Sequence, residues 1–518
     1  MKSATRALGV LLCLSCGNNP PAVPPDMTVP EDLTFPKSFL FGTAIAGFQV
    51  DMGCPSMKAG CTDSNSDWYV WVTNKDLINE TGLAITGEPV TDGPGFYETY
   101  PADLDRAQKE LSNNALRLSI EWSRVFPTST IGIEDPAAIK AAASPDGLAY
   151  YHALFAAMKA RGLKPLVTID HYTLPTWIHD AYGCHTDIAN CSPRGWLDDH
   201  IVHEAAKYAG FLGSEFGGEV DLWATLNEPF TAVVVAGYLV PSAARSNPPG
   251  VFFDAVNGKK AMVAMFSAHA RMYDALKAAD TIDADGDGKA ARVGIVYNMQ
   301  AIAPDNPDDP QDQMGAKNLD YLMNQVFLNA VINGDVDANL DGTTTHDPML
   351  AGRMDFLGIN YYARVVATGT PSSVFPKISP LLDVDLPAAL AQADYNYPRG
   401  IYEVIKQAQR WKLPMFITET GVDDAMDAGK APAWLTDTLI WVKRAIAEGA
   451  DVEGYFWWTL MDNYEWNHGM TFHLGMYGVD GKDPTKKRVT RQTVGVYSRI
   501  ASGFAIPDDL AAKYPAPR

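Results

Sequence analysis

Eight short apolar segments recur along the chain and limit what it can fold into. Each is long enough for a buried strand, and several follow stretches with helical spacing, such as residues 147–161 and 434–448. Continuous apolar strands that alternate with helices are typical of a parallel sheet covered on both faces. Eight such strands predict a closed (β/α)8 barrel, the TIM barrel, with a doubly wound open sheet as the alternative. The eight segments are residues 39–48, 115–120, 165–170, 220–226, 291–298, 354–362, 414–420 and 452–460.

The length of the chain fits one large barrel. Its 518 residues, 47% of them hydrophobic, are enough either for one α/β barrel or for two or three ordinary domains. The sequence contains no internal repeat, no long low-complexity tract and no linker in mid-chain. We therefore predict a single domain over residues 31–518, with long loops between strands and helices.

The N-terminus has the layout of a secretory signal. Lys2 and Arg6 precede an apolar run over residues 7–14, which is too short to span a bilayer. Leu14, Ser15 and Cys16 resemble the end of a bacterial lipoprotein signal, in which the Cys becomes lipidated. We predict a signal peptide over residues 1–15 and an extended Pro-rich tether over residues 16–30, with simple cleavage without lipid as the alternative. The protein is then exported, to the cell envelope, the periplasm or the medium, and contacts a membrane only through a lipid anchor.

The net charge and the spacing of the cysteines bear on nucleic-acid binding, disulfide pairing and zinc binding. The net charge of −21 would repel phosphate backbones, so nucleic acid is excluded as a partner. Four further cysteines form two pairs, Cys54 with Cys61 and Cys184 with Cys191, each seven residues apart. Four cysteines allow three pairings, and the two local disulfides are the simplest choice for an exported protein. The lack of a CxxC pair argues against zinc held by cysteines.

Polar side chains follow the apolar segments at the ends where a barrel places its active site. Any one of them fits a helix cap or a loop, but their number predicts a functional site at the carboxyl ends of the strands. They are Gln49, Arg117, His171, Asn227, Glu228, Asn298, Asn360, Tyr361, Glu419 and Trp458.

Two of these residues are glutamates, Glu228 within WATLNEP and Glu419 within FITET. Cleavage of a glycosidic bond uses two carboxyl groups, one to protonate the leaving oxygen and one to attack the sugar, about 5 Å apart in retaining enzymes. Across one barrel mouth the two glutamates can share a substrate. From the residues alone, structural ion pairs with arginine remain the alternative.

From residue 35 to about 497 the sequence resembles glycoside hydrolase family 1. Seven motifs occur in the order of that family, and their wording is most similar to its archaeal-type branch. The motifs are FLFGTAIAGFQVD, RLSIEWSRVFP, VTIDHYTLP, TLNEP, DFLGINYY, ITETG and GYFWWTLMDNYEWNHGM.

The resemblance implies a retaining β-glycosidase that works through a covalent glycosyl-enzyme and needs no cofactor. Glu228 would be the acid/base and Glu419 the nucleophile. Arg117 would lie beside Glu419 and keep it ionised, and Tyr361 would donate a hydrogen bond to the same carboxylate. Glu228 would hold its proton to higher pH. Asn298 would support this catalytic group. The residues that would bind the sugar are Gln49, His171, Asn227, Trp458, Glu465 and Trp466.

The sequence departs from the family pattern at three places. Thr420 replaces the Asn that usually follows the nucleophile, residues 49–51 read Gln-Val-Asp in place of Gln-x-Glu, and residues 171–173 read His-Tyr-Thr in place of His-Trp-Asp. None of these changes removes a catalytic group. Both glutamates are present, which argues against a myrosinase-like relative, and Glu465 argues against the phospho-sugar branch.

The expected substrates are therefore neutral β-glucosides, β-galactosides or β-fucosides. A transglycosylase with the same site is the nearer alternative, and a non-catalytic sugar-binding lipoprotein is the more distant one. The aglycone and the oligomeric state are not predicted from the sequence, because long loops set specificity without a readable code.

One further motif, DADGDG at residues 283–288, imitates the start of a calcium loop. Asp283, Asp285 and Asp287 are the candidate ligands, but Gly294 stands where a full loop needs a bidentate Glu. The motif makes a weak calcium candidate, and a solvated loop is the simpler interpretation.

Overall fold

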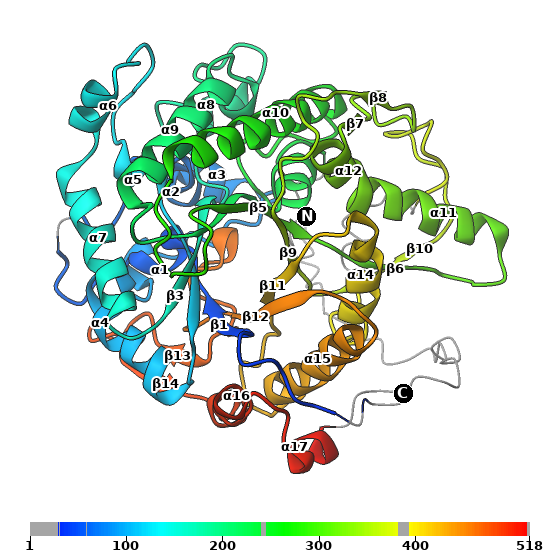
Figure 1. Cartoon of the computed structure of the whole chain (residues 1–518). Coiled ribbons are helices and arrows are strands. Elements are labelled where there is room, and N and C mark those ends of the chain that lie inside the picture. The colour runs from blue at the N-terminus through cyan, green and yellow to red at the C-terminus, as the bar shows by residue number, and fades with distance from the viewer. Residues whose placement is uncertain (1–29, 31, 59, 240–244, 382–392, 515–518) are drawn as a thin grey trace, which may run out of the picture.

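Eight parallel strands close into a barrel in a computed structural model that describes residues 30, 32–58, 60–239, 245–381 and 393–514 (Figure 1). The order around the ring is β1, β12, β11, β9, β5, β4, β3 and β2. The predicted barrel is confirmed, and each of the eight apolar segments supplies one strand. The strands are β1 (Leu40–Ala44), β2 (Ala115–Ser119), β3 (Lys164–Asp170), β4 (Leu222–Asn227), β5 (Arg292–Asn298), β9 (Phe356–Asn360), β11 (Met415–Thr420) and β12 (Val452–Trp458).

Pairing between the first and last strands closes the ring. Ala44 lies opposite Trp458 on one side of β1 and opposite Arg117 on the other. Because all eight strands run in the same direction, their carboxyl ends meet at one mouth of the barrel. The register shifts near the ends of β4 and β11, between Ala224 and Asn227 and between Ile417 and Glu419. Such irregularities re-aim side chains, and here they fall on the strands that carry the two glutamates.

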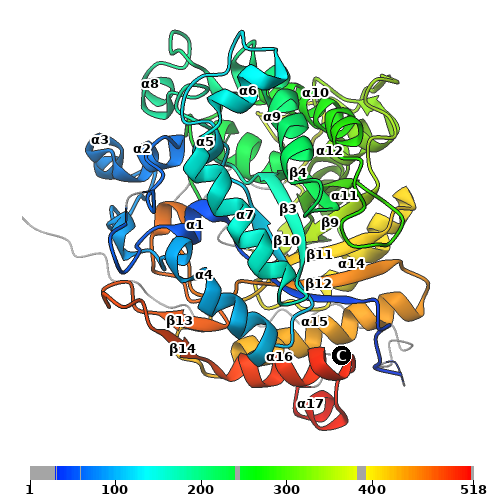
Figure 2. The same cartoon turned by 60° about the vertical axis from the view of Figure 1, so that its left-hand side comes forward.

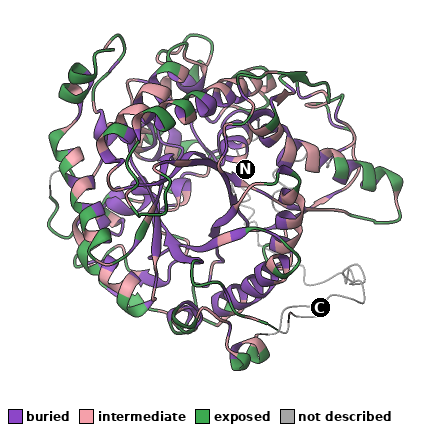
Figure 3. Ribbon diagram, in the orientation of Figure 1, coloured by how far each residue is buried: buried purple, intermediate pink, exposed green. Residues whose placement is uncertain are grey.

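Apolar side chains fill the barrel and the layer between the strands and the helices. Figure 3 shows buried strands surrounded by helices whose outer faces are exposed. The continuous apolar runs of the strands follow from this arrangement, since both faces of the sheet are covered. The interior cluster consists mainly of Leu40, Ala44, Ala115, Leu166, Leu222, Ala224, Val296, Phe356, Phe416, Phe456 and Trp458.

The helices form an outer ring, in which α4 and α7 lie side by side (Figure 2). Helix α7 begins at Pro145, two residues before the predicted stretch, because Ser144 caps it by accepting from the N–H of Gly147 and Pro145 occupies its first turn. The longer helices are α4 (Phe96–Asp105), α7 (Pro145–Lys159), α9 (Ile201–Phe216), α10 (Ala255–Ala279), α11 (Pro310–Asp320), α12 (Val326–Asn333), α14 (Gly400–Ala408), α15 (Lys430–Ala447) and α16 (Gln492–Gly503).

Shorter elements belong to the connecting loops. The short helices are α1 (Gly47–Asp51), α2 (Asp67–Thr73), α3 (Lys75–Asn79), α5 (Trp122–Val125), α6 (Pro136–Ala142), α8 (Ala181–Thr186) and α17 (Asp508–Lys513). The 3-10 turns are η1 (Val90–Asp92), η3 (Gly195–Leu197), η6 (Gln409–Trp411) and η7 (Trp466–His468). The π-helical segments are η2 (Arg106–Glu110), η5 (Tyr321–Gln325) and the longer η4 (Pro229–Leu239), which follows β4. Three small two-stranded sheets pair β6 (Ala301–Pro304) with β10 (Arg364–Ala367), β7 (Asp335–Val336) with β8 (Thr345–His346), and β13 (Tyr477–Val479) with β14 (Arg488–Thr490).

Two disulfides close short loops that follow strand ends, and the predicted pairing is confirmed. Cys54 is bonded to Cys61 after β1, with 6.1 Å between their Cα atoms. Cys184 is bonded to Cys191 after β3, with 4.9 Å between their Cα atoms. Both disulfides therefore brace loops on the side of the barrel where the strands end.

The predicted signal peptide, almost all of the tether and the lipidation site at Cys16 lie outside the described residues. Within the part of the chain that the structure describes, no helix combines the length and the apolar character that a membrane span requires.

Candidate active site

Glu228 lies at the end of β4, and both of its carboxylate oxygens accept hydrogen bonds. The hydroxyl of Tyr172 donates to Oε2 at 2.8 Å, and the side-chain amides of Asn298 and Asn360 donate to Oε1 at 3.1 and 2.7 Å. Glu228 is buried and has a φ of +45°, a left-handed conformation that is rare outside glycine. Its N–H still donates to the carbonyl of Val296 on β5, so the strand pairing holds the strained residue in place.

Glu419 lies on β11 and meets a cation and a hydroxyl. Arg117 of β2 forms an ion pair with Oε1, and the hydroxyl of Tyr362 donates to Oε2 at 2.8 Å. The Arg117 guanidinium also donates to Thr168 Oγ1 at 3.1 Å and to Asn227 Oδ1 at 2.8 Å. Its side chain is fully buried and is held on three sides, so it fixes the carboxylate rather than following it.

The predicted hydrogen bond from the Tyr361 hydroxyl to the Glu419 carboxylate is wrong by one residue, although the N–H of Tyr361 donates to the backbone carbonyl of Glu419 at 2.9 Å. The hydroxyl of Tyr361 donates to the carbonyl of Tyr397, and its ring stacks on Trp434 with 6.2 Å between ring centroids. Successive side chains of a strand point to opposite faces. Asn360, at the end of β9, points into the barrel, Tyr361 points out toward the helices, and Tyr362 returns to the mouth.

Burial and hydrogen bonding shift the pKa of Glu419 in opposite directions. Burial raises its pKa to about 7, the nearby Glu228 adds to the rise, and Arg117 and the hydroxyl of Tyr362 lower it. The expectation that Arg117 keeps Glu419 ionised is therefore too simple, because removal of water from the carboxylate outweighs the cation.

One hydrogen-bonded network joins the two glutamates. Arg117 bonds both Glu419 and Asn227, and Asn360 donates to Asn227 Oδ1 at 3.3 Å as well as to Glu228. Thr418 donates to Asn360 Oδ1 at 2.8 Å, which fixes the orientation of that amide. The barrel thus brings together two carboxylates from strands that are far apart in the sequence.

Gln49 and Glu465 form a polar wall beside this network. Glu465 Oε2 accepts from Gln49 Nε2 at 2.9 Å and from Asn463 Nδ2 at 2.8 Å. Among the described residues, the buried Gln49 Oε1 has no hydrogen-bond partner. A buried acceptor without a partner costs free energy unless a ligand or water supplies a donor.

Aromatic rings form the adjacent wall. His171 stacks on Trp458 and Trp466, with 5.9 Å between centroids in each case. Burial, with the Arg117 and Arg245 cations adding to it, holds the pKa of His171 well below its usual range, so the ring is neutral. Asn227 donates to His171 Nε2 at 3.1 Å, which places the ring proton on Nδ1. Within the described residues, Nδ1 has no partner, so it is a donor ready for a ligand.

Three further residues at the site do not appear among the predicted site residues. In the sequence Tyr172 is only a departure from the family pattern, and Tyr362 is the neighbour of the predicted Tyr361. Arg245 lies in no motif. Its guanidinium carbon is 5.5 Å from the ring centroid of Tyr172 and 5.8 Å from that of Trp466, and its Nη1 is 3.4 Å from Glu465 Oε1. Alternation along β9 could have identified Tyr362, whereas nothing in the local sequence marks Arg245.

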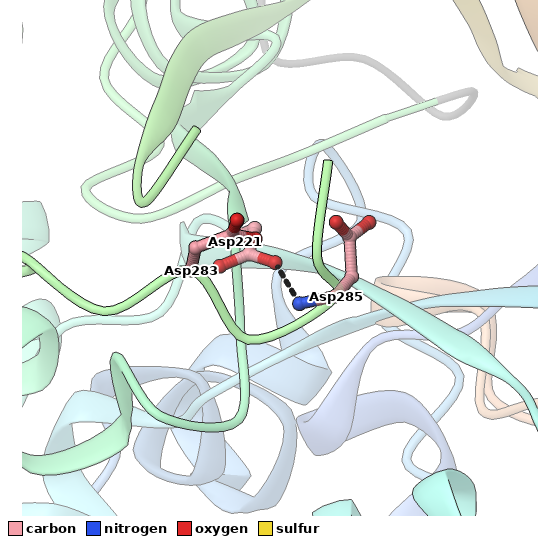
Figure 4. A group of neighbouring side chains, drawn as sticks. All are labelled: Asp221, Asp283 and Asp285. Carbon is pink, nitrogen blue, oxygen red and sulfur yellow. Dashed lines mark hydrogen bonds between the residues drawn. The ribbon is translucent and has the colours of Figure 1, made fainter. Parts of the chain in front are cut away.

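The calcium candidate lies at the other end of the barrel. Figure 4 shows Asp283 and Asp285 grouped with Asp221, which immediately precedes β4, and their oxygens lie within 4.8 Å of one another. Asp287, one of the predicted ligands, is not a member and accepts from the N–H of Lys289 instead. Backbone N–H groups bond the Asp221 carboxylate, and Lys164 lies 2.8 Å from Asp285. Calcium binding stays a prediction. The acidic group is separated from the active site by the length of the barrel.

Comparisons with known proteins agree with this geometry. A family profile described as glycosyl hydrolase family 1 matches residues 31–503. The chain is 34% identical over 511 residues to a β-galactosidase from Pyrococcus woesei, covering 91% of this chain and 97% of that protein. It is 32% identical over 499 residues to a β-galactosidase from Saccharolobus solfataricus, covering 91% and 96%. The crystal structure of the β-glycosidase from Thermosphaera aggregans superimposes with a TM-score of 0.79 at 28% identity, covering 93% and 100%.

Proposed function

Because the chain belongs to glycosyl hydrolase family 1, we propose that Glu228 and Glu419 are the catalytic pair of a retaining β-glycosidase that releases terminal β-linked glucose, galactose or fucose. The observation that carries the assignment is the network through Arg117, Asn227 and Asn360, which joins two buried carboxylates of different character. Paired carboxylates of this kind suit one to act as an acid and the other as a nucleophile.

The partners of each carboxylate support the division of roles. Glu419 faces a fixed cation, which stabilises the ionised form that attacks the anomeric carbon. Glu228 faces neutral amide and hydroxyl groups, which suit a residue that must gain and lose a proton in each cycle. It would protonate the leaving oxygen in the first step and deprotonate water in the second.

Unsatisfied polar atoms support a neutral sugar as the substrate. Gln49 Oε1 and His171 Nδ1 offer a buried acceptor and a buried donor, and sugar hydroxyls supply both complements. The Glu465 carboxylate accepts hydroxyl donors and repels phosphate, and Trp458 offers a flat face to the sugar ring. Trp466 is buried, with Phe48 and His171 stacked on its ring, so it shapes this wall from behind. The names of the relatives, β-galactosidase and β-glycosidase, support hydrolysis over transglycosylation or binding without turnover. A panel of aryl β-glycosides would rank the sugars.

Amide substitutions test the catalytic pair. We expect Glu419→Gln to abolish turnover, because an amide cannot form the glycosyl-enzyme. Glu228→Gln should slow the hydrolysis of glycosides with poor leaving groups by about 100- to 10,000-fold, the usual range for lost general acid catalysis, and affect activated aryl glycosides less.

Glu204→Gln is the matched control, because Glu204 is a buried carboxylate on α9 that pairs with Lys207 and Thr130 away from the site. It should lower the melting temperature and leave turnover per folded molecule unchanged. Full activity in Glu419→Gln would overturn the assignment.

We propose separately that the enzyme is exported and anchored through Cys16. The apolar run at residues 7–14 and the Leu-Ser-Cys sequence that ends at Cys16 support this. Labelled palmitate should enter the wild-type protein and be absent from Cys16→Ala. A secreted, unlabelled wild type would leave simple cleavage as the explanation.

A further inference from the structure

Tyr172 stands where the common family motif has tryptophan, and its hydroxyl donates to Glu228 Oε2 at 2.8 Å. Phenylalanine could fill the same space without this contact. Tyr172 has a φ of +76°, so the chain accepts a strained backbone that places the side chain against the glutamate.

Several groups fix the ring of Tyr172. It packs against Trp466 with 4.8 Å between centroids and against His171 with 4.9 Å. The guanidinium of Arg245 lies over the ring at 5.5 Å and also reaches Glu465. The hydroxyl therefore cannot follow Glu228 if that side chain moves, and Glu228 Oε2 is held at a fixed point.

The three donors on Glu228 are not chemically equivalent. Oε1 accepts from two amides, and an amide N–H only donates, so a proton on Oε1 would clash with both. The proton of the acid form therefore belongs on Oε2, which is the oxygen that meets Tyr172. A hydroxyl donates to an ionised carboxylate more strongly than to a neutral carboxylic acid. The contact consequently favours the ionised form, which is the form that activates water in the second step.

We propose that Tyr172 is a positioning residue that sets the pH at which Glu228 releases its proton. The inference rests on the proposed function, since it assumes that Glu228 is the acid/base. Arg245 lies over the same ring and helps to hold it in place.

Other charged and titratable groups face Glu228 and must stay constant in a test. They are Glu419 of β11, Tyr362 after β9, and Arg245 after η4, with the neutral His171 at the end of β3. Tyr172→Phe keeps the aromatic ring beneath Arg245 and removes only the hydroxyl. The substitution removes the hydroxyl contact to Glu228 together with the hydrogen bond between Arg245 and Tyr172, and it leaves every charged group around Glu228 in the chain.

The test is the pH profile of kcat/KM on an alkyl β-glucoside, whose leaving group needs acid assistance. In Tyr172→Phe the alkaline limb, where Glu228 loses its proton, should move up by about one pH unit, as expected for loss of one hydrogen bond to a charged group. The acidic limb, set by Glu419, should not move.

The matched control is Tyr464→Phe. Tyr464 lies in the same apolar cluster as Tyr172 and Trp466, but its hydroxyl donates to the backbone carbonyl of Glu88 at 2.7 Å. This variant should lose stability without moving either limb. An unmoved alkaline limb in an active Tyr172→Phe enzyme would overturn the proposal, whereas absence of turnover in the wild type would overturn the proposed function instead.

A second variant keeps the test decisive if Tyr172→Phe does not fold. Site-specific difluorotyrosine at position 172 keeps the ring and makes the hydroxyl a stronger donor. The alkaline limb should then move to lower pH. A limb that stays in place with the fluorinated residue would contradict the proposal.

Discussion

At the scale of single residues, the protonation of Glu419 decides the activity at low pH. Its pKa is raised to about 7, mainly by burial. The carboxylate must be ionised to attack, so a fall in pH through 7 removes the nucleophile. We therefore expect kcat/KM to fall on the acidic side of about pH 7.

The hydroxyl of Tyr362 lowers the pKa of Glu419, which makes Tyr362→Phe informative. Loss of the hydroxyl should move the acidic limb of kcat/KM to higher pH by about one unit. The neighbouring Tyr361→Phe is the control, because its hydroxyl bonds the carbonyl of Tyr397. A shift in Tyr361→Phe with none in Tyr362→Phe would contradict the geometry described for β9.

The same pair of tyrosines marks the limit of prediction at this scale. The motif DFLGINYY indicates a tyrosine beside the nucleophile, but the choice between Tyr361 and Tyr362 depends on where β9 ends and how its last side chains alternate. Arg245 and the hydroxyl of Tyr172 depend on loop conformation, and no local periodicity encodes it. Glu228, Glu419 and Arg117 could be identified because strand ends and motifs coincide there.

At the scale of elements, the sequence is a good guide to the barrel strands and to the short disulfide loops. All eight strands were located because a strand buried on both faces leaves a continuous apolar run. The register shifts in β4 and β11 could not be located, because a bulge changes the pairing without changing the apolar pattern.

The loop disulfides make a prediction about stability. Reduction of Cys184–Cys191, or its replacement by two alanines, should lower the free energy of unfolding by about 2 kcal/mol. The effect is modest because a disulfide between residues seven apart closes a short loop and removes little entropy from the unfolded chain. Thermal unfolding of the variant and of the matched Cys54 and Cys61 variant would measure the effect. No change in the melting temperature of either variant would contradict a stabilising role.

At the scale of the whole molecule, the barrel explains how residues from distant parts of the chain form one site. Arg117, Glu228 and Glu419 come from β2, β4 and β11, and parallel closure brings their strand ends to one mouth. The acidic group around Asp221 lies at the opposite end. Catalysis should therefore depend on the mouth alone, with the loops around it setting the aglycone preference.

The stereochemistry of the first product tests this account most directly. A fixed nucleophile and a separate acid/base predict double displacement, so an aryl β-glucoside should release the β-anomer of glucose first. Proton NMR during the first turnovers distinguishes the anomers before they interconvert. Initial release of the β-anomer is the predicted result, and initial release of the α-anomer would contradict the assignment of Glu419 as the nucleophile.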